Sequence, residues 1–334
     1  MFRIINDMVE NNLESMISVL IPAYNVQGKL DKMFESLINQ TCKLFNVLII
    51  DDGSVDSTFE IIQKYTEKYS FIHGLTQKNR GVAYTRQRLI ELCETEFFIF
   101  CDADDYLDIH TIQWVNNVIK SHEVDIVIWG YRLVRQNGEK VILRRQLEQG
   151  EHVKIEWEKL HVQGLADLYW SSSCNKCYRK SVYAKPEKIK YQTLMEDVCF
   201  NIEYLSRCTK MYVLEKALYN YVQIGTSLTR IKQNDKREDI SDALELYSKM
   251  FILLNLSYTN EKNENAVYIL NRFLWLIDRA KRINDNYMVM EIKKSPIFNI
   301  VKSKCGVRVI KVYRTYYFQK LKTIIKKVMT ALRG

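Results

Sequence analysis

Residues 97–108 read FFIFCDADDYLD and place four carboxylates directly after five residues that carry almost no polar atoms. The continuous apolar run 97–101 predicts a central strand of a parallel sheet, buried on both faces. Ligands of open α/β sheets bind beyond the carboxyl ends of such strands. Carboxylates held side by side repel one another unless hydrogen bonds or a cation offset the repulsion. The cluster therefore suggests a divalent cation with oxygen ligands, and a polar turn before a helix is the simpler alternative.

Composition limits the class of protein. The chain has 334 residues, about two domains' worth, with 47% hydrophobic and 27% charged residues, as in soluble globular proteins. No apolar run approaches the ~18 to 20 residues of a membrane span. The first sixteen residues carry early acids and no apolar core, so we expect an extension rather than a signal peptide. Eight cysteines without a framework predict free thiols in a reducing compartment, which favours the cytoplasm.

Positive charge is concentrated at the C-terminal end. The net charge is +9, yet twelve Lys and Arg and no acid follow Glu291, which leaves −3 for the rest of the chain. A mildly acidic body argues against a nucleic-acid-binding core. Within 302–334 apolar residues recur every three or four positions, with lysines on another face. This pattern is typical of a basic amphipathic helix on a membrane surface, and packing on its own domain or on another subunit is the alternative.

The rest of the chain alternates strand and helix patterns. Strands are expected at 17–21, 45–50, 71–75, 97–101 and 125–131, and helices at 30–40, 58–69, 82–93 and 109–120. Repeated units of this kind predict a parallel sheet with right-handed crossovers. The polar stretch 135–152 breaks the rhythm as an insertion or hairpin. We therefore expect an N-terminal extension (1–16), an α/β domain (17–234), a helical region (235–301) and the basic tail (302–334).

Four loops follow the predicted strands at the same sheet edge. They read PAYN (22–25), DDGSVDS (51–57), QKNRG (77–81) and DADD (102–105). Two loops are acidic and the third supplies an amide, a glycine and basic residues, a natural arrangement for a metal-bound diphosphate. The second loop lacks the lysine of a Walker loop, and no GxGxxG follows the first strand. These absences argue against NTP hydrolysis of that type and against a dinucleotide-binding fold.

The order of the motifs resembles glycosyltransferase family 2 enzymes of GT-A fold, of the bacterial capsule and cell-wall type. The resemblance covers about residues 16–225 and rests on ISVLIPAYN, VLIIDDGSVDST, NRGVAYTR, FFIFCDADD and LMEDVCFN. It implies an α/β fold with a Rossmann-like, mostly parallel sheet flanked by helices, and a C-terminal helical region. It also implies transfer of one sugar from a nucleotide-sugar donor, of uridine type, to a glycan or lipid-linked glycan acceptor. The site would work at the inner face of the plasma membrane, and homo-oligomerisation stays open.

The same resemblance assigns roles to individual residues. It places the donor nucleotide against Pro22, Tyr24, Asn25, Asp52, Asn79, Gly81, Arg86, Asp102 and Ala103. It places Mg2+ or Mn2+ on Asp104 and Asp102, where the cation would neutralise a leaving diphosphate. It matches Glu196 and Asp197 to a catalytic pair, with Asp197 as the base for an acceptor hydroxyl. One metal-binding acid and one distant base imply a single displacement and inversion at the anomeric carbon, by analogy with inverting glycosidases.

Some residues depart from the family pattern or allow a simpler interpretation. Gln87 stands where an Asn is usual, residues 174–178 read CNKCY, and the absence of QxxRW argues against processive polymerisation. Glu196 and Asp197 could simply begin a helix, where acids favour the positive end of the dipole. Arg86 could be a surface helix residue. Trp157, Tyr169 and Trp170 could line an acceptor groove or the core, and Ser227 and Arg230 could reach a phosphate or lie in a solvated loop.

Two other functions compete with this interpretation. A HAD-like phosphatase also carries a DxD after a strand, but it needs Thr or Val where this chain has Tyr106, and it leaves PAYN and DDGS unexplained. A non-catalytic carbohydrate-binding or assembly protein would tolerate loss of acidic residues. Intact Asp104 and Asp197 argue against that alternative.

Overall fold

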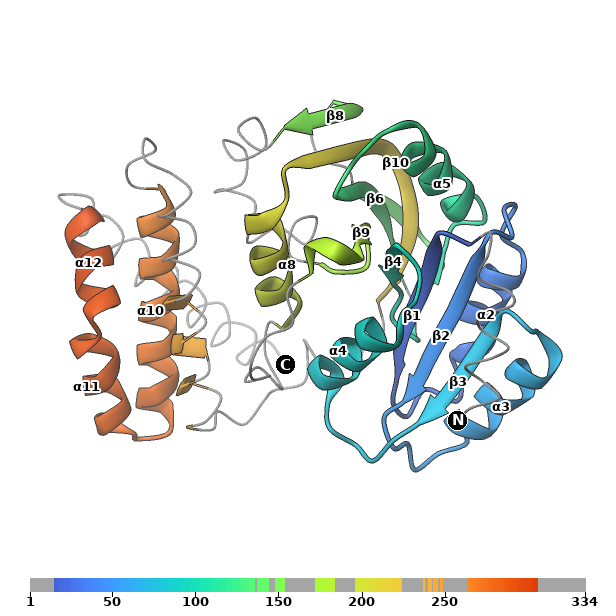
Figure 1. Ribbon diagram of the computed structural model, residues 1–334. Helices are drawn as coiled ribbons and strands as arrows, with labels where there is room; N and C mark the ends of the chain where they lie inside the picture. Colours follow the sequence, from blue (N-terminus) through green and yellow to red (C-terminus); the bar gives the residue numbers. More distant parts are fainter. Residues whose placement is uncertain are drawn as a thin grey trace. The chain divides into compact units, whose positions relative to one another are not determined.

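The protein was analysed as a computed structural model, which describes residues 15–135, 137–143, 148–153, 172–183, 196–223 and 264–305, with isolated positions between 237 and 248. The chain divides into two compact units, residues 1–231 and 232–334. The first unit is an α/β domain built on one sheet, and the second is helical (Figure 1). Predictions for the N-terminal extension up to residue 14 and for residues 306–334 lie outside the described part.

The first four long strands of the sheet are parallel, as predicted. They are β1 (Ile17–Ala23), β2 (Phe45–Asp51), β3 (Ile72–Thr76) and β4 (Phe97–Phe100). β1 lies between β2 and β4, and β3 pairs with the outer side of β2. Every residue of β2 and β4 is buried, which explains why these strands show continuous apolar sequence rather than alternation. Their carboxyl ends bring the four predicted loops to one edge.

The remaining strands make the sheet mixed rather than purely parallel. β9 (Lys176–Arg179) pairs antiparallel with both β4 and β6 (Ile126–Val134), and β10 (Lys210–Val222) runs parallel to β6. β5 (Tyr106–Leu107) and β8 (Gly150–Val153) pair antiparallel with β10. β7 (Lys140–Leu143) pairs antiparallel with β6, which confirms the predicted hairpin after the fifth strand.

The predicted helices of the first unit are present within two residues of their expected ends. They are α2 (Leu30–Ile38), α3 (Thr58–Lys68), α4 (Val82–Leu92) and α5 (Thr111–Ser121), followed later by the short η1 (Lys180–Val182) and by α8 (Glu196–Arg207). In Figure 1, α2 and α3 lie on one side of the strands β1–β3 and α4 lies on the other. α4 packs against β1 and β2.

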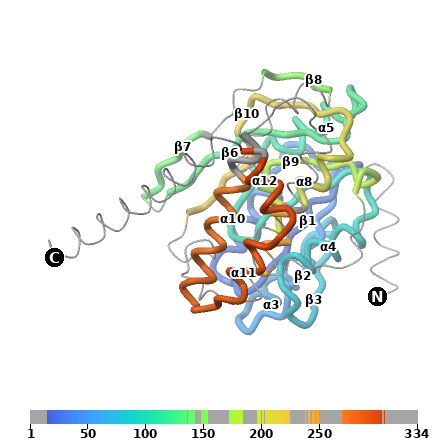
Figure 2. Tube along the Cα trace, turned by 90° about the vertical axis from the view of Figure 1, so that its left-hand side faces the viewer, coloured from blue at the N-terminus to red at the C-terminus, as the bar shows by residue number. Residues whose placement is uncertain are grey.

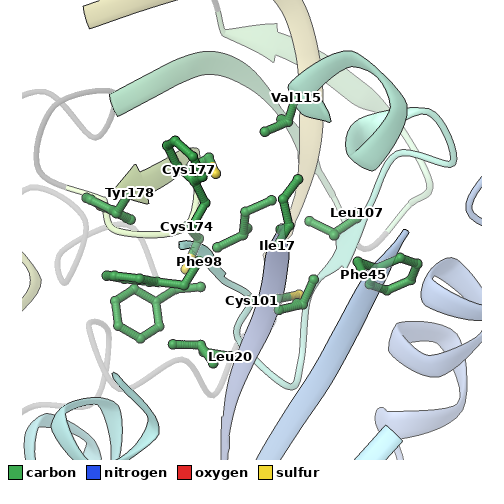
Figure 3. Close-up of a cluster of buried hydrophobic side chains, with 14 of the residues drawn as sticks. Ile17, Leu20, Phe45, Phe98, Cys101, Leu107, Val115, Cys174, Cys177 and Tyr178 are labelled. Carbon is green, nitrogen blue, oxygen red and sulfur yellow. The ribbon is translucent and has the colours of Figure 1, made fainter. Parts of the chain in front are cut away.

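Aromatic side chains and thiols fill the core behind the loops. Phe98 and Tyr178 belong to this cluster (Figure 3), and their rings stack with centroids 5.2 Å apart. Phe100 contacts the Tyr178 ring edge-on. Cys101 and Cys174 are buried in the same cluster, and burial raises the pKa of both thiols well above the usual value. All cysteines whose side chains the structure describes are free, which confirms that part of the prediction.

The second unit consists of helices, as expected for the region after residue 235. α11 (Asn286–Lys294) and α12 (Pro296–Cys305) both pack along α10 (Glu264–Arg282), as Figure 2 shows. The Asp285 side chain caps α11 by accepting from Met288 N at 2.8 Å. Pro296 starts α12, where its missing N–H costs no helical bond. In the described part of the chain, no helix is long and apolar enough to span a membrane.

Two loops meet closely at Gly53. This residue has φ +72°, and a Cβ built on it would lie 2.7 Å from Asn79 N and 3.0 Å from Gln77 O. Only glycine accepts both the left-handed backbone and this approach of one main chain to another. Gly53 therefore lets the loop after β2 rest directly on the loop after β3.

Replacing Gly53 by alanine should destabilise the protein by about 1–3 kcal/mol, because the substitution forces a strained φ and displaces the Asn79 backbone. Urea unfolding measures the effect as a lower midpoint. Gly28→Ala is the matched control, since a Cβ there meets nothing within 4 Å, and it should change stability by less than about 0.5 kcal/mol. Equal stability of Gly53→Ala and the unsubstituted protein would contradict this account of the loop contact.

Candidate active site

Asn25 joins the first loop to the second. Its backbone N–H donates to Ser54 Oγ at 2.9 Å, and its Oδ1 accepts from Val55 N at 2.9 Å. It also has φ +50°, a conformation that asparagine tolerates better than most residues. Asn25, which the family resemblance places against the donor nucleotide, thus also has a structural role. It holds the PAYN loop and the DDGS loop together.

Asp52 organises the third loop and the start of α4. Its carboxylate, only 4% exposed, accepts from Gln77 Nε2 at 2.7 Å, Arg80 N at 2.9 Å and Gly81 N at 2.8 Å. Gly81 precedes α4 with φ +85°. The contact of Asp52 with a nucleoside remains a prediction. Three hydrogen-bond donors of the protein itself already contact this carboxylate.

Other predicted donor residues of these loops are accessible. The Tyr24 side chain is 49% exposed, Asn79 is exposed and Pro22, near the end of β1, is partly exposed. Val55 is also fully accessible, at 89% exposure, and lies beside Asn25 in the bonded loop pair. The surface that could receive a nucleoside is therefore formed by accessible side chains on and beside the loops that Asn25 and Asp52 hold together.

The four acids after β4 have different environments. Asp105 is 3% exposed and accepts from Tyr219 Oη and Val222 N, both at 2.7 Å. Asp108 accepts from Arg132 Nη1 at 3.0 Å. These two acids attach the loop to β10 and β6, so hydrogen bonds explain them without a cation. Ala103, a predicted donor contact, has its side chain in the core.

Asp104 is the acid of the DxD with the longer ion-pair contact. Its Oδ2 lies 3.5 Å from Lys29 Nζ, and the two side chains are 38% and 34% exposed. Burial and the charge of Asp102 raise the pKa of Asp104, and Lys29 opposes that shift. The sequence interpretation did not include Lys29. The sequence did offer one sign of this contact, because Lys29 lies in the loop that follows PAYN and directly precedes α2.

Arg86 bridges the DxD to the later acidic pair. Its Nη2 lies 2.7 Å from Asp102 Oδ1, and its Nη1 lies 2.8 Å from Glu196 Oε1. Burial disfavours the charge of Arg86, but the two carboxylates outweigh burial and raise its pKa. The guanidinium is therefore an internal connection between β4 and α8, and the interpretation of Arg86 as a surface residue is wrong.

Glu196 and Asp197 form the first turn of α8, as the helix-start interpretation required. They also face the Arg86 bridge, so the two interpretations are compatible. Burial, followed by the charge of Glu196, raises the pKa of Asp197 to about 7, while Arg86 and the Val198 N–H act in the opposite direction. A carboxyl with a pKa near neutrality suits a general base.

The described residues include no group of three or more His, Cys, Asp or Glu side chains arranged to hold a metal ion. Mg2+ is commonly held by one or two carboxylates together with substrate phosphates, so a partial protein site still fits this chemistry. Asp104 fits best, because its charge is only weakly compensated by Lys29. Asp102 is already paired with Arg86.

Several other predicted features are structural or lie outside the described residues. The Gln87 side chain donates to Glu91 Oε1 at 2.7 Å, along α4. In the CNKCY segment, Asn175 Nδ2 donates to Trp129 O at 2.9 Å, and Lys176 is buried. The predictions for Trp157, Tyr169, Trp170, Ser227 and Arg230 fall outside the described ranges.

Comparison with known proteins agrees with the motif order. The model of Glycosyl transferase family 2 matches residues 18–185, half of the chain. YibD of Escherichia coli K12, described as an uncharacterized glycosyltransferase, is 26% identical over 258 residues, covering 75% of this chain and 74% of that protein. The poly(ribitol-phosphate) beta-N-acetylglucosaminyltransferase TarP of Staphylococcus aureus N315 is 28% identical over 218 residues, 63% of each protein.

A solved structure shares the fold. The crystal structure of S. aureus TarS residues 1–349 in complex with UDP-GlcNAc superposes with a TM-score of 0.61 and 21% identity, covering 91% of this chain and 92% of that one. This agreement extends to the mostly parallel mixed sheet and the helices that follow it. Because the family model spans half of the chain, the protein belongs to glycosyl transferase family 2 and is an enzyme of the glycosyltransferase class.

Proposed function

We propose that this enzyme transfers one sugar from a UDP-sugar to a glycan or lipid-linked glycan acceptor during surface polysaccharide synthesis, with Mg2+ or Mn2+ and with inversion. The observation that carries this proposal is the Asp102–Arg86–Glu196 bridge, which joins the DxD to the start of α8, where the next residue, Asp197, has a pKa of about 7. A similar fold binds UDP-GlcNAc in TarS, which supports a uridine-type donor. TarP acts on poly(ribitol-phosphate), which supports a polymeric surface acceptor.

The residues of the donor side would bind and orient the leaving group. Tyr24, Asn79 and Pro22 offer accessible surface for the nucleoside, on loops that Asn25 and Asp52 hold rigid. Asp104 would hold the divalent cation, which when bound neutralises the charge that develops on the diphosphate. Asp102 would support the same site from its ion pair with Arg86.

The residues of the acceptor side would move the proton. Asp197 would accept the proton of the attacking hydroxyl, whose own pKa is far above neutrality. Glu196, fixed by Arg86, would raise the basicity of Asp197 through its charge and hold the first turn of α8 in place. With the base and the diphosphate served by separate groups, attack on the face opposite the leaving group inverts the anomeric carbon.

We further propose that the enzyme is cytoplasmic and associates peripherally with the inner face of the plasma membrane. Positive charge without acids after Glu291 supports attraction to anionic lipids. Part of this charge lies on residues that the structure describes. They are Lys293 and Lys294 in α11 and Lys302 in α12, and all three are exposed. The family match argues against a HAD-like phosphatase. Intact Asp104 and Asp197 argue against a non-catalytic member of the family.

Removing the divalent cation should abolish donor binding and transfer. UDP-GlcNAc with Mn2+ should raise the unfolding temperature by mass action, and EDTA or Asp104→Asn should remove that rise. Asp108→Asn is the matched control, because Asp108 lies in the same loop but pairs with Arg132. It should keep the donor-dependent rise even if it lowers basal stability. Full transfer activity in EDTA would contradict the metal assignment.

Asp197→Asn should reduce sugar transfer by roughly 10²- to 10⁴-fold, the cost of losing a positioned general base. Affinity for the nucleotide sugar should stay nearly unchanged, because the diphosphate is held at the Asp104 side. Glu196→Gln should do less. Titrations of donor binding and turnover assays of both variants measure this difference, and near-normal transfer by Asp197→Asn would refute the assignment.

The pH profile gives a second measurement of the same base. Asp197 acts only when deprotonated, so kcat/KM should rise with pH and level off above about 7. Because the charge of Glu196 raises the pKa of Asp197, Glu196→Gln should move this limb to lower pH. A limb that does not move would show that Glu196 exerts no charge effect on the base.

The full-length protein should co-sediment with anionic liposomes at low salt and not with neutral ones. Each basic residue near such a surface contributes ~1 kcal/mol, and salt weakens the attraction. A chain ending at Val301 should remain in the supernatant while still cleaving the donor slowly. If the full-length protein ignores anionic liposomes at low salt, the basic residues serve packing instead.

A further inference from the structure

Lys29 lies against the acid that would receive the donor's cation. Its Nζ is 3.5 Å from Asp104 Oδ2, and its backbone N–H donates to Val26 O at 2.9 Å, which fixes the turn that carries it. Both side chains of the pair are about one third exposed. The contact thus lies at the surface where a diphosphate would arrive, rather than within the core.

Three arginines of the third loop and α4 have other partners. Arg86, the predicted diphosphate contact, is bonded to Asp102 and Glu196. Arg80 stacks over the Tyr84 ring, with 3.7 Å between the guanidinium carbon and the centroid. Arg88 Nη1 donates to Gln77 Oε1 at 2.6 Å. Lys29 has a single carboxylate contact, at the long end of the hydrogen-bonding range, and is therefore more easily released to a phosphate than Arg86, which makes two short ion pairs.

An ammonium and a divalent cation compete for the same carboxylate oxygen. Without a ligand, Lys29 offsets part of the repulsion between Asp104 and Asp102. A divalent cation at Asp104 would carry more positive charge than the Lys29 ammonium does. The Lys29–Asp104 contact would then no longer be needed to offset the repulsion between the two acids. Lysine has a flexible stem and a compact charge, so Nζ can turn from the carboxylate to a phosphate oxygen nearby.

We propose that Lys29 is a donor-binding residue that contacts the diphosphate of the nucleotide sugar, and that in the free enzyme it occupies Asp104 as a counter-ion. This inference rests on the proposed function. It adds one residue to the donor site, and it adds a change of partner in which Lys29 moves from Asp104 to the diphosphate. Lys29 therefore acts in opposite directions on two ligands. It weakens binding of the free cation and strengthens binding of the nucleotide diphosphate.

Lys29→Gln in the full-length protein tests both effects, with Lys32→Gln as the matched control. Lys32 lies one turn further along, where its Nζ is 4.3 Å from the centroid of the Tyr106 ring. Without nucleotide, Lys29→Gln should bind Mn2+ several-fold more tightly than the unsubstituted protein, measured by titration calorimetry. With saturating Mn2+, it should bind UDP about tenfold more weakly, the size expected for loss of a hydrogen bond between charged groups.

The variants and the unsubstituted protein together distinguish failure of the role of Lys29 from failure of the proposed function. Lys29→Arg should restore part of the UDP affinity and Lys32→Gln should change neither ligand, with thermal unfolding confirming that all variants are folded. Unchanged UDP affinity in Lys29→Gln, or weaker Mn2+ binding, would overturn the role of Lys29 alone. If the unsubstituted protein binds neither UDP nor GDP with Mn2+, the proposed function itself is wrong, and the phosphate-binding role of Lys29 with it.

Discussion

The site depends on one buried cation shared between two carboxylates. Arg86 extends from α4 and binds Asp102 at the end of β4 and Glu196 at the start of α8. A charge taken out of water is tolerated only when partners and hydrogen bonds compensate it, and removing one partner leaves the others uncompensated. The bridge therefore ties the acidic loop to a helix that begins about ninety residues later. This constraint fixes the position of Asp102 relative to the first turn of α8, which carries Glu196 and Asp197.

The acidic loop illustrates how a charge cluster can serve both folding and chemistry. Tyr219 and the Val222 N–H satisfy Asp105, and Arg132 satisfies Asp108, so the loop is anchored to the sheet by half of its acids. Burial, together with the negative charges of Asp102 and Asp104, raises the pKa of Asp105 well above its usual value. The other two acids have different ion pairs: Asp102 lies 2.7 Å from Arg86 Nη2, and Asp104 lies 3.5 Å from Lys29 Nζ.

The sequence predicted the parallel half of the sheet well because β1, β2 and β4 are buried on both faces and are therefore mostly apolar along their whole length. It did not predict β9, whose four residues include a lysine and an arginine and whose partners are distant in sequence. The roles of the acids were equally hidden. Asp104 and Asp105 are adjacent and chemically identical, and only tertiary contacts with Lys29 and Tyr219 distinguish them.

Glu196 and Asp197 show why neighbouring acids need not compete for one role. Arg86 Nη1 lies 2.8 Å from Glu196 Oε1, and burial, followed by the charge of Glu196, raises the pKa of Asp197. The ion pair thus occupies Glu196, while Asp197 forms no ion pair with another residue that the structure describes. The positive end of the α8 dipole favours acids in the first turn as well. The ion pair that positions the helix therefore also acts on the pKa of the residue proposed to accept the proton: Glu196 adds to the effect of burial, and Arg86 opposes it.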